Sequence, residues 1–189
     1  YKQDVKSDGT VDSYYGIYGQ LHTADGEMLG TEFQVNTRPD YNQQDPSVTA
    51  LKNGDFVVTW ESNYQDTTTS AEYGIYGQRF DTNGSPKGDE FRVHTQASYE
   101  QYDPSVAALD NGGFVVTWRD DSGQGGHSYE VRAQVFDADG QEVGYSFGVN
   151  TYKDNYQYQA EVEALDDGGL VVAWSSQNQD GRGYGINAP

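Results

Sequence analysis

The sequence predicts an all-β fold made of tandem four-stranded antiparallel repeats that resemble the blades of a β-propeller. Three observations support it. A segment ending in tryptophan occurs three times, with 58 residues between Trp60 and Trp118 and 56 between Trp118 and Trp174. Each repeat contains four runs of β-branched and aromatic residues, and Gly-containing dipeptides separate them. A fixed period of this size with four strands per period is typical of propeller blades. A tandem of β-sandwiches and an open β array are the alternatives.

The four strands are clearest in the middle repeat. They are expected at 73–80, around Phe91 to Val93, at 104–109 and at 114–118. Asn or Asp followed by Gly, as at Asn83-Gly84, favours tight hairpin turns between them because Gly tolerates positive φ. The fourth strand is apolar on both faces, so we expect it to be covered on both sides. Its tryptophan is then a core residue.

The repeat boundaries follow from the same pattern. We expect repeats at 14–71, 72–128 and 129–183, with 1–13 as the tail of a preceding unit and 184–189 as the start of a further one. No Pro- or Ser-rich linker separates them, so neighbouring units should pack directly on each other. Partner surfaces are therefore expected first on other repeats, of the same or a longer chain, and then in self-assembly.

The charge of the chain excludes some classes of partner. The 30 acidic residues outnumber the 11 basic ones, giving a formal net charge of −19. Nucleic acid and anionic membrane surfaces are bound through Lys and Arg, so neither is expected as a partner. Solubility in an extracellular or salty medium, divalent cations, or a basic partner would each account for the acidity. The chain has no cysteine and no apolar run long enough to span a membrane.

The sequence motifs of the repeats resemble those of a known family. The segments are Gly-Phe-Val-Val-Thr-Trp at 113–118, Tyr-Gly-Ile-Tyr-Gly-Gln-Arg-Phe-Asp at 73–81, Glu-Phe-Arg-Val-His-Thr at 90–95 and Asp-Pro-Ser-Val-Ala-Ala-Leu at 103–109. Together they resemble a tandem repeat of large secreted bacterial proteins of the RTX type, which carry hemolysin-type calcium-binding repeats. The resemblance implies an extracellular or cell-surface location, a calcium-rich setting and an adhesive role. The RTX nonapeptide itself is not present in the sequence.

Calcium is the first candidate ligand because carboxylate and carbonyl oxygens are plentiful in the turns. Paired oxygen side chains two residues apart could converge on one cation, and ordinary hairpin turns are the competing interpretation. The candidate metal ligands are Asp25, Asp81, Asn83, Asp137 and Asp139.

Carbohydrate is the second candidate ligand. Tyrosines in the loops that precede the third strand offer flat faces for sugar rings, with Gln and Asp side chains nearby. Packing over the edge of the core is the competing interpretation. The candidate sugar-binding residues are Tyr99, Tyr102, Tyr156 and Tyr158.

Catalysis has little support in the sequence. None of the three histidines, His22, His94 and His127, recurs between repeats, and no nucleophile-elbow pattern is present. A carboxylate pair of a glycosidase cannot be selected among 30 acids.

The sequence therefore predicts a non-catalytic, calcium-stabilised extracellular module of a bacterial cell surface, with a multivalent lectin as the alternative. Function is expected where the repeats differ, in the loops at 61–71, 96–102, 119–128 and 152–158.

Overall fold

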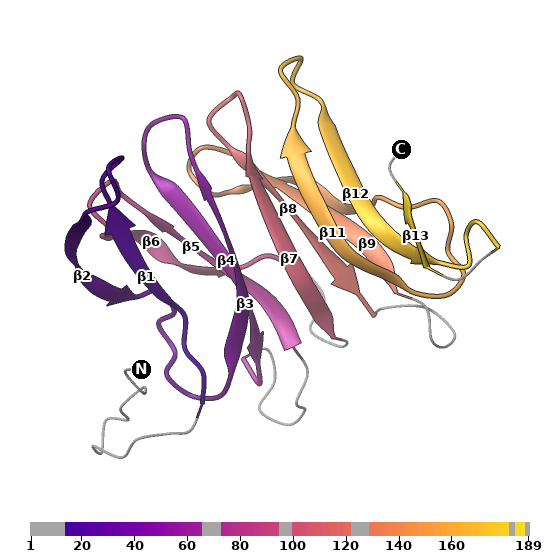
Figure 1. Cartoon of the computed structure of the whole chain (residues 1–189), viewed down its shortest axis with the longest axis horizontal. Coiled ribbons are helices and arrows are strands. Elements are labelled where there is room, and N and C mark those ends of the chain that lie inside the picture. The colour runs from indigo at the N-terminus through magenta and orange to yellow at the C-terminus, as the bar shows by residue number, and fades with distance from the viewer. Residues whose placement is uncertain (1–13, 66–72, 95–99, 122–128, 182–183, 188–189) are drawn as a thin grey trace.

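A computed structural model describes residues 14–65, 73–94, 100–121, 129–181 and 184–187. These residues form thirteen strands joined by turns (Figure 1). The strands are β1 (Tyr18–His22), β2 (Met28–Gln34), β3 (Gln43–Ala50), β4 (Phe56–Asn63), β5 (Tyr73–Phe80), β6 (Pro86–Arg92), β7 (Gln101–Ala108), β8 (Phe114–Asp120), β9 (Glu130–Phe136), β10 (Glu142–Gly148), β11 (Gln157–Ala164), β12 (Leu170–Gln177) and β13 (Tyr184–Asn187).

The strands form successive antiparallel sheets. β3-β4-β5-β6 make sheet A, β7-β8-β9-β10 make sheet B, and β11-β12-β13 make sheet C, while β1 pairs with β2 alone. Each four-stranded sheet joins the last two strands of one sequence repeat to the first two strands of the next. The sheets are therefore out of phase with the repeats as divided in the sequence. The predicted all-β architecture of four-stranded antiparallel sheets is confirmed.

The sheets stand side by side, and the edge strands β3, β7 and β11 lie next to one another (Figure 1). We call these three strands the inner strands. Sheet B packs on both neighbours. One apolar cluster joins it to sheet A, for example through Val57 and Trp118, and another joins it to sheet C, through Val115 and Val162. A third cluster joins β1 and β2 to sheet A through Ile17 and Trp60. A tandem of sandwiches would pair the sheets two by two, whereas here the middle sheet is covered on both faces.

The Trp-containing strands are central in sheets A and B, as the alternation of their residues predicts. Trp60 and Trp118 are 0% and 1% exposed, and Val115 and Val116 on opposite faces of β8 are both inaccessible. The prediction that the tryptophans are core residues is confirmed. The scaffold therefore depends on the features that the three repeats share.

Glycine in the first strand of a repeat has a specific neighbour. A Cβ built on Gly77 would lie 2.6 Å from Cζ of Phe91, and Gly19 faces Phe33 in the same way. Glycine spaced between large residues in this strand predicts the close approach of a backbone or another sheet. The structure instead places a phenylalanine ring from the adjacent strand over these glycines.

In the described part of the chain, no helix has the length and apolar character needed to cross a membrane.

Candidate functional site

Each inner strand is interrupted at the same place by an irregularity in its pairing. The register shifts between Gln44 and Ser47 in β3, between Tyr102 and Ser105 in β7, and between Tyr158 and Glu161 in β11. Such β-bulges redirect side chains and are common beside active sites.

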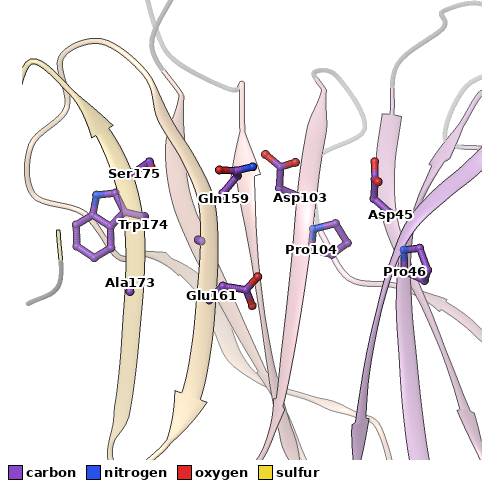
Figure 2. Close-up of a pocket in the computed structure, with 10 residues that line it drawn as sticks. Asp45, Pro46, Asp103, Pro104, Gln159, Glu161, Ala173, Trp174 and Ser175 are labelled. Carbon is purple, nitrogen blue, oxygen red and sulfur yellow. The ribbon is translucent and has the colours of Figure 1, made fainter. Parts of the chain in front are cut away.

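The residue that starts each bulge has left-handed backbone conformation. The φ angles are 50° at Asp45, 54° at Asp103 and 50° at Gln159. Non-glycine residues adopt this region at a cost of about 1 kcal/mol or more, and Asp and Asn tolerate it best. The three polar side chains form a row across the three inner strands (Figure 2). We call these three residues the bulge row.

A hollow of about 550 Å³ runs along the bulge row. Its wall also contains the residue that follows each bulge residue, together with three consecutive residues of β12, as Figure 2 shows. Three carboxylates line it, from Asp45, Asp103 and Glu161. Glu161 is fixed in part by Ser105, whose Oγ donates a hydrogen bond of 2.8 Å to Oε2. The hollow therefore brings acids from three separate repeats to one place.

The guanidinium group of Arg119 lies beside the hollow, among three tyrosine rings. The guanidinium carbon of Arg119 is 4.5 Å from the ring centroid of Tyr102, 4.7 Å from that of Tyr129 and 5.2 Å from that of Tyr158. Its Nε is 3.5 Å from Oδ2 of Asp103. Cation–π contacts and the nearby carboxylate both hold the guanidinium in place.

This arginine also lines a second recess, of about 490 Å³. Asp103, Gln159 and Ser175 line both the recess and the hollow, so the two are continuous. The combined surface offers carboxylates, an amide, a hydroxyl, a guanidinium and a tyrosine.

Glu61 lies behind the bulge at Asp103. Its side chain is buried, at 1% exposure, and its Oε1 accepts a hydrogen bond of 2.7 Å from the backbone N–H of Asp103. Its Oε2 accepts one of 3.0 Å from Nε2 of Gln44. The pKa of Glu61 is raised from 4.5 to about 7, mainly because burial disfavours the charged form; the hydrogen bonds from Asp103 and Gln44 oppose this rise, and the charges of Asp45 and Asp103 add to it. Glu61 thus connects β4 to the backbone of the bulge in the next sheet.

Glu61, Arg119 and Ser175 occupy equivalent positions, each directly after the tryptophan of its repeat. The loops in which function was expected begin at Glu61 and Arg119, but neither residue was assigned a role, and Ser175 and the carboxylates of the bulge row were missed. A signal was present, because the three repeats agree at the tryptophan and differ at the next residue. That residue contacts the inner strand of the following sheet in two repeats, where Glu61 accepts the N–H of Asp103 and Arg119 lies against the ring of Tyr158.

The predicted sugar-binding tyrosines lie close together. Tyr102 and Tyr158 contact Arg119, and the ring centroids of Tyr156 and Tyr158 are 5.7 Å apart. All three are half-buried. Burial, followed by Glu100, raises the pKa of Tyr102 well above its usual range. Tyr99 lies outside the described residues.

The predicted calcium ligands lie on separate hairpin turns. Oδ1 of Asp81 accepts hydrogen bonds from the N–H groups of Asn83 and Ser85, and Oδ1 of Asp137 accepts them from those of Asp139 and Gln141. These are the local hydrogen bonds of ordinary turns.

Asp25, the remaining candidate, lies in the turn between β1 and β2. Over the residues that the structure describes, no group of three His, Cys, Asp or Glu side chains could hold a metal ion. Calcium binding stays a prediction.

The histidines have no shared site. His94 is 2% exposed, and its Nδ1 accepts the N–H of Ile75, as Oδ1 of Asn36 accepts that of Ile17. His22 is exposed and contacts the carbonyl oxygen of Gly26. His127 lies outside the described residues. His94 therefore takes a structural position that asparagine fills in the other repeats.

Comparison with known proteins identifies the fold. No protein-family model matches the sequence, and no curated protein sequence matches it either. Among solved structures, the α-L-arabinanase of Penicillium chrysogenum has a TM-score of 0.59 at 17% identity, over 96% of this chain and 51% of that one. The endo-arabinase of Bacteroides thetaiotaomicron has a TM-score of 0.55 at 16% identity, over 89% of this chain and 63% of that one. A Hadza microbial sialidase has a TM-score of 0.57 at 14% identity, over 77% and 37%.

The chain has the β-propeller-like fold of these proteins. It spans between about a third and two thirds of the length of the structures that it matches. At identities of 14 to 17%, TM-scores of 0.55 to 0.59 show a common fold alone.

Two predictions are corrected by these matches. The resemblance to RTX-type calcium-binding repeats is wrong, because the structures that share the fold are arabinanases and a sialidase. The prediction of a non-catalytic, calcium-stabilised adhesive module is also wrong, because it relied on that resemblance, whereas the structures that share the fold are arabinanases and a sialidase. The sequence could not select a carboxylate pair because bulges and repeat-to-repeat packing bring acids of different repeats together, and neither can be read from spacing along the chain.

Proposed function

We propose that this chain is part of a carbohydrate-active β-propeller and binds a neutral oligosaccharide along the bulge row. The observation that carries the proposal is the continuous hollow in which Asp45, Asp103 and Gln159 from three repeats lie beside Arg119 and Tyr158. The arabinanase folds of similar structures support the class of ligand.

The chemistry of the wall suits sugar hydroxyls. Carboxylate and amide oxygens accept hydrogen bonds from hydroxyl groups, while the amide nitrogen and the guanidinium donate them. Arg119 is already oriented by three rings, so little conformational entropy would be lost when it binds. Tyr158 lines the recess and can contact an apolar sugar face.

The charge of the wall favours a neutral ligand. Three carboxylates line the hollow, and the chain as a whole carries a net charge of −19. A glycan rich in carboxylates or sulfates would be repelled by this field. Arg119 does not reverse that preference, because Asp103 lies 3.5 Å from its Nε.

Hydrolysis of a glycosidic bond is the second candidate function. Glycosidases of most families use two carboxyl groups on either side of the scissile bond, and the hollow has three. Asp103 and Glu161 are the pair that we assign to this chemistry, because they lie on the adjacent inner strands β7 and β11. Secretion and a cell-surface location accord with a polysaccharide ligand and form part of the proposal.

Binding and hydrolysis can be measured separately. Titration calorimetry with neutral oligosaccharides, arabinan fragments first, tests binding, and release of reducing ends from the polymer tests hydrolysis. Tyr158→Ala should weaken binding at least tenfold, while Tyr145→Ala on β10, which changes a residue 93% exposed, should leave it unchanged.

Asp103→Asn and Glu161→Gln should abolish release of reducing ends with binding largely retained, and Asp139→Asn on a hairpin turn is the matched control. Binding without hydrolysis would identify a lectin. If neither the oligosaccharides nor the polymers bind, the proposed function is wrong.

A further inference from the structure

Three asparagines of this chain precede a glycine, and all three lie in hairpin turns. The dipeptides are Asn53-Gly54 between β3 and β4, Asn83-Gly84 between β5 and β6, and Asn111-Gly112 between β7 and β8. Asparagine before glycine is chemically labile, because a residue without a side chain lets its backbone nitrogen approach the amide carbon of the asparagine. All three asparagines are exposed. Neither the dipeptide nor its exposure therefore distinguishes the three positions.

The backbone of the glycine does not distinguish them either. In each turn the N–H of the glycine donates to the carbonyl oxygen three residues earlier, at 2.9 Å for Gly54 and at 3.0 Å for Gly84 and Gly112. The φ angles of these glycines are 88°, 80° and 89°. The glycine nitrogen is held in the same way at the three positions, so a difference in reactivity must come from the asparagine side chain.

Two of the three side chains are held by hydrogen bonds. Oδ1 of Asn53 accepts the N–H of Asp55 at 3.0 Å, and its Nδ2 donates to Oδ2 of Asp55 at 2.7 Å. Oδ1 of Asn111 accepts the N–H of Gly113 at 3.0 Å. Both turns begin at a leucine, so it is the asparagine that accepts the N–H following the glycine. These side chains must break a hydrogen bond before the amide carbon can turn toward the glycine nitrogen.

Asn83 differs because an aspartate begins its turn. Oδ1 of Asp81 accepts the N–H groups of Asn83 and Ser85, at 2.8 and 2.9 Å. Asp81 thereby takes the role that asparagine has in the other two turns. In the described part of the chain, no residue hydrogen-bonds to the side-chain amide of Asn83. This amide can rotate without breaking a hydrogen bond.

The third repeat shows that this turn accepts an aspartate. Asp139 occupies the position of Asn83, and Oδ1 of Asp137 accepts the N–H groups of Asp139 and Gln141 as Asp81 accepts those of its own turn. Conversion of the asparagine to aspartate is therefore compatible with the hairpin.

We propose that Asn83 is a site of spontaneous deamidation in the folded chain and reacts before Asn53 and Asn111. The backbone nitrogen of Gly84 loses its proton and attacks Cγ of Asn83. The new C–N bond closes a succinimide, and the side-chain nitrogen leaves as ammonia. Water then opens the succinimide at either of its carbonyl groups and gives aspartate or isoaspartate. Because the attacking nitrogen must lose a proton, the rate rises with pH.

The two products differ in how well they fit the structure. Isoaspartate adds a methylene group to the backbone beside Gly84, and this turn lies against β1 and β2. A Cβ built on Gly84 would lie 3.2 Å from Cε1 of Phe33 and 3.5 Å from Cδ1 of Leu21. The longer backbone disturbs this contact, so the isoaspartate form should unfold at a lower temperature than the variant Asn83→Asp. That variant should unfold together with wild type.

Peptide mapping by mass spectrometry, after incubation of the whole chain at pH 6 and at pH 8, tests the proposal. In the folded chain, conversion of amide to acid should be several-fold faster at Asn83 than at Asn53 or Asn111, and faster at pH 8. Asn83→Gln should remove the reaction from this turn and leave the other two rates unchanged. The same chain in guanidinium chloride is the matched control. There the turn hydrogen bonds are lost, and the three rates should become similar.

Equal rates at the three asparagines of the folded chain overturn the proposal, and so does faster conversion at Asn53 or Asn111. Asn83 could also lead by the same factor in guanidinium chloride. Its neighbours along the sequence would then be the cause, and the explanation from the turn hydrogen bonds would be wrong.

Discussion

The buried carboxyl group of Glu61 should make the stability of this chain fall as the pH rises from about 5 to about 8. Its pKa in the folded protein is about 7, against an ordinary value of 4.5, so the folded state holds the proton more tightly than the unfolded chain. The contribution of this carboxyl group to stability is fully present below its ordinary pKa and is lost as the pH rises through the pKa in the folded protein. A pKa difference of this size corresponds to a loss of about 3 kcal/mol in the free energy of unfolding at pH 8 relative to pH 5.

The substitution Glu61→Gln tests this origin. The amide oxygen can still accept the N–H of Asp103, and Gln44 can present its own oxygen to the new amide nitrogen. The variant has no ionisable group at this position, so its melting temperature should change little between pH 5 and pH 8. At pH 8 it should melt above wild type, by up to about 6 to 12 °C for a chain of this size.

The assay is thermal unfolding followed by circular dichroism at pH 5, 6, 7 and 8. Asp55 does not interfere, because the hydrogen bond from Lys87 lowers its pKa below 3.8 and its effect on stability appears only at lower pH. Equal pH dependence in wild type and variant would refute the reasoning, because Glu61 would then not titrate in this range. Lower stability of the variant at pH 8 would show that the ionised carboxylate stabilises the bulge.

Three further outcomes follow from the packing of the sheets. Gly77→Ala should destabilise the chain by about 1–3 kcal/mol, measured by denaturant unfolding, because the new methyl group would lie 2.6 Å from Cζ of Phe91. Trp118→Ala should cost about 3–5 kcal/mol in the same assay, since the side chain is 1% exposed between two sheets. His94→Asn should be nearly neutral because Asn150 accepts the N–H of Val131 at the equivalent position, whereas His94→Ala should cost about 1–3 kcal/mol by leaving the N–H of Ile75 unpaired. Equal losses for both His94 variants would contradict the structural role.

The elements that the sequence predicted well are those whose conformation depends on residues close together along the chain. Asn and Asp before glycine specify the hairpin turns, where Gly84 and Gly140 have φ angles of 80° and 81°. Two-sided apolar strands specify sheets covered on both faces, as Val115 and Val116 show. The same local chemistry accounts for the turn hydrogen bonds of Asp81 and Asp137, which were the predicted calcium ligands.

The candidate site could not be predicted in the same way. Its acids are 58 residues apart in the case of Asp45 and Asp103, and only the stacking of sheets places them in one hollow. The tyrosines predicted to bind sugar do lie together, yet what brings Tyr102 and Tyr158 together is Arg119, which lies in the expected functional loop at 119–128 but could not be assigned a role from the sequence.

By itself, the sequence determined the repeat, the strands, the turns and the tryptophan core, because each depends on residues close together along the chain. The tertiary structure alone decided how strands are shared between repeats, since each four-stranded sheet takes two strands from one repeat and two from the next. It also decided which side chains meet. Glu61 acquires its partner Asp103, and Arg119 its contact with Tyr158, from the inner strand of the following sheet, and contacts between sheets depend on three-dimensional packing that no local pattern encodes.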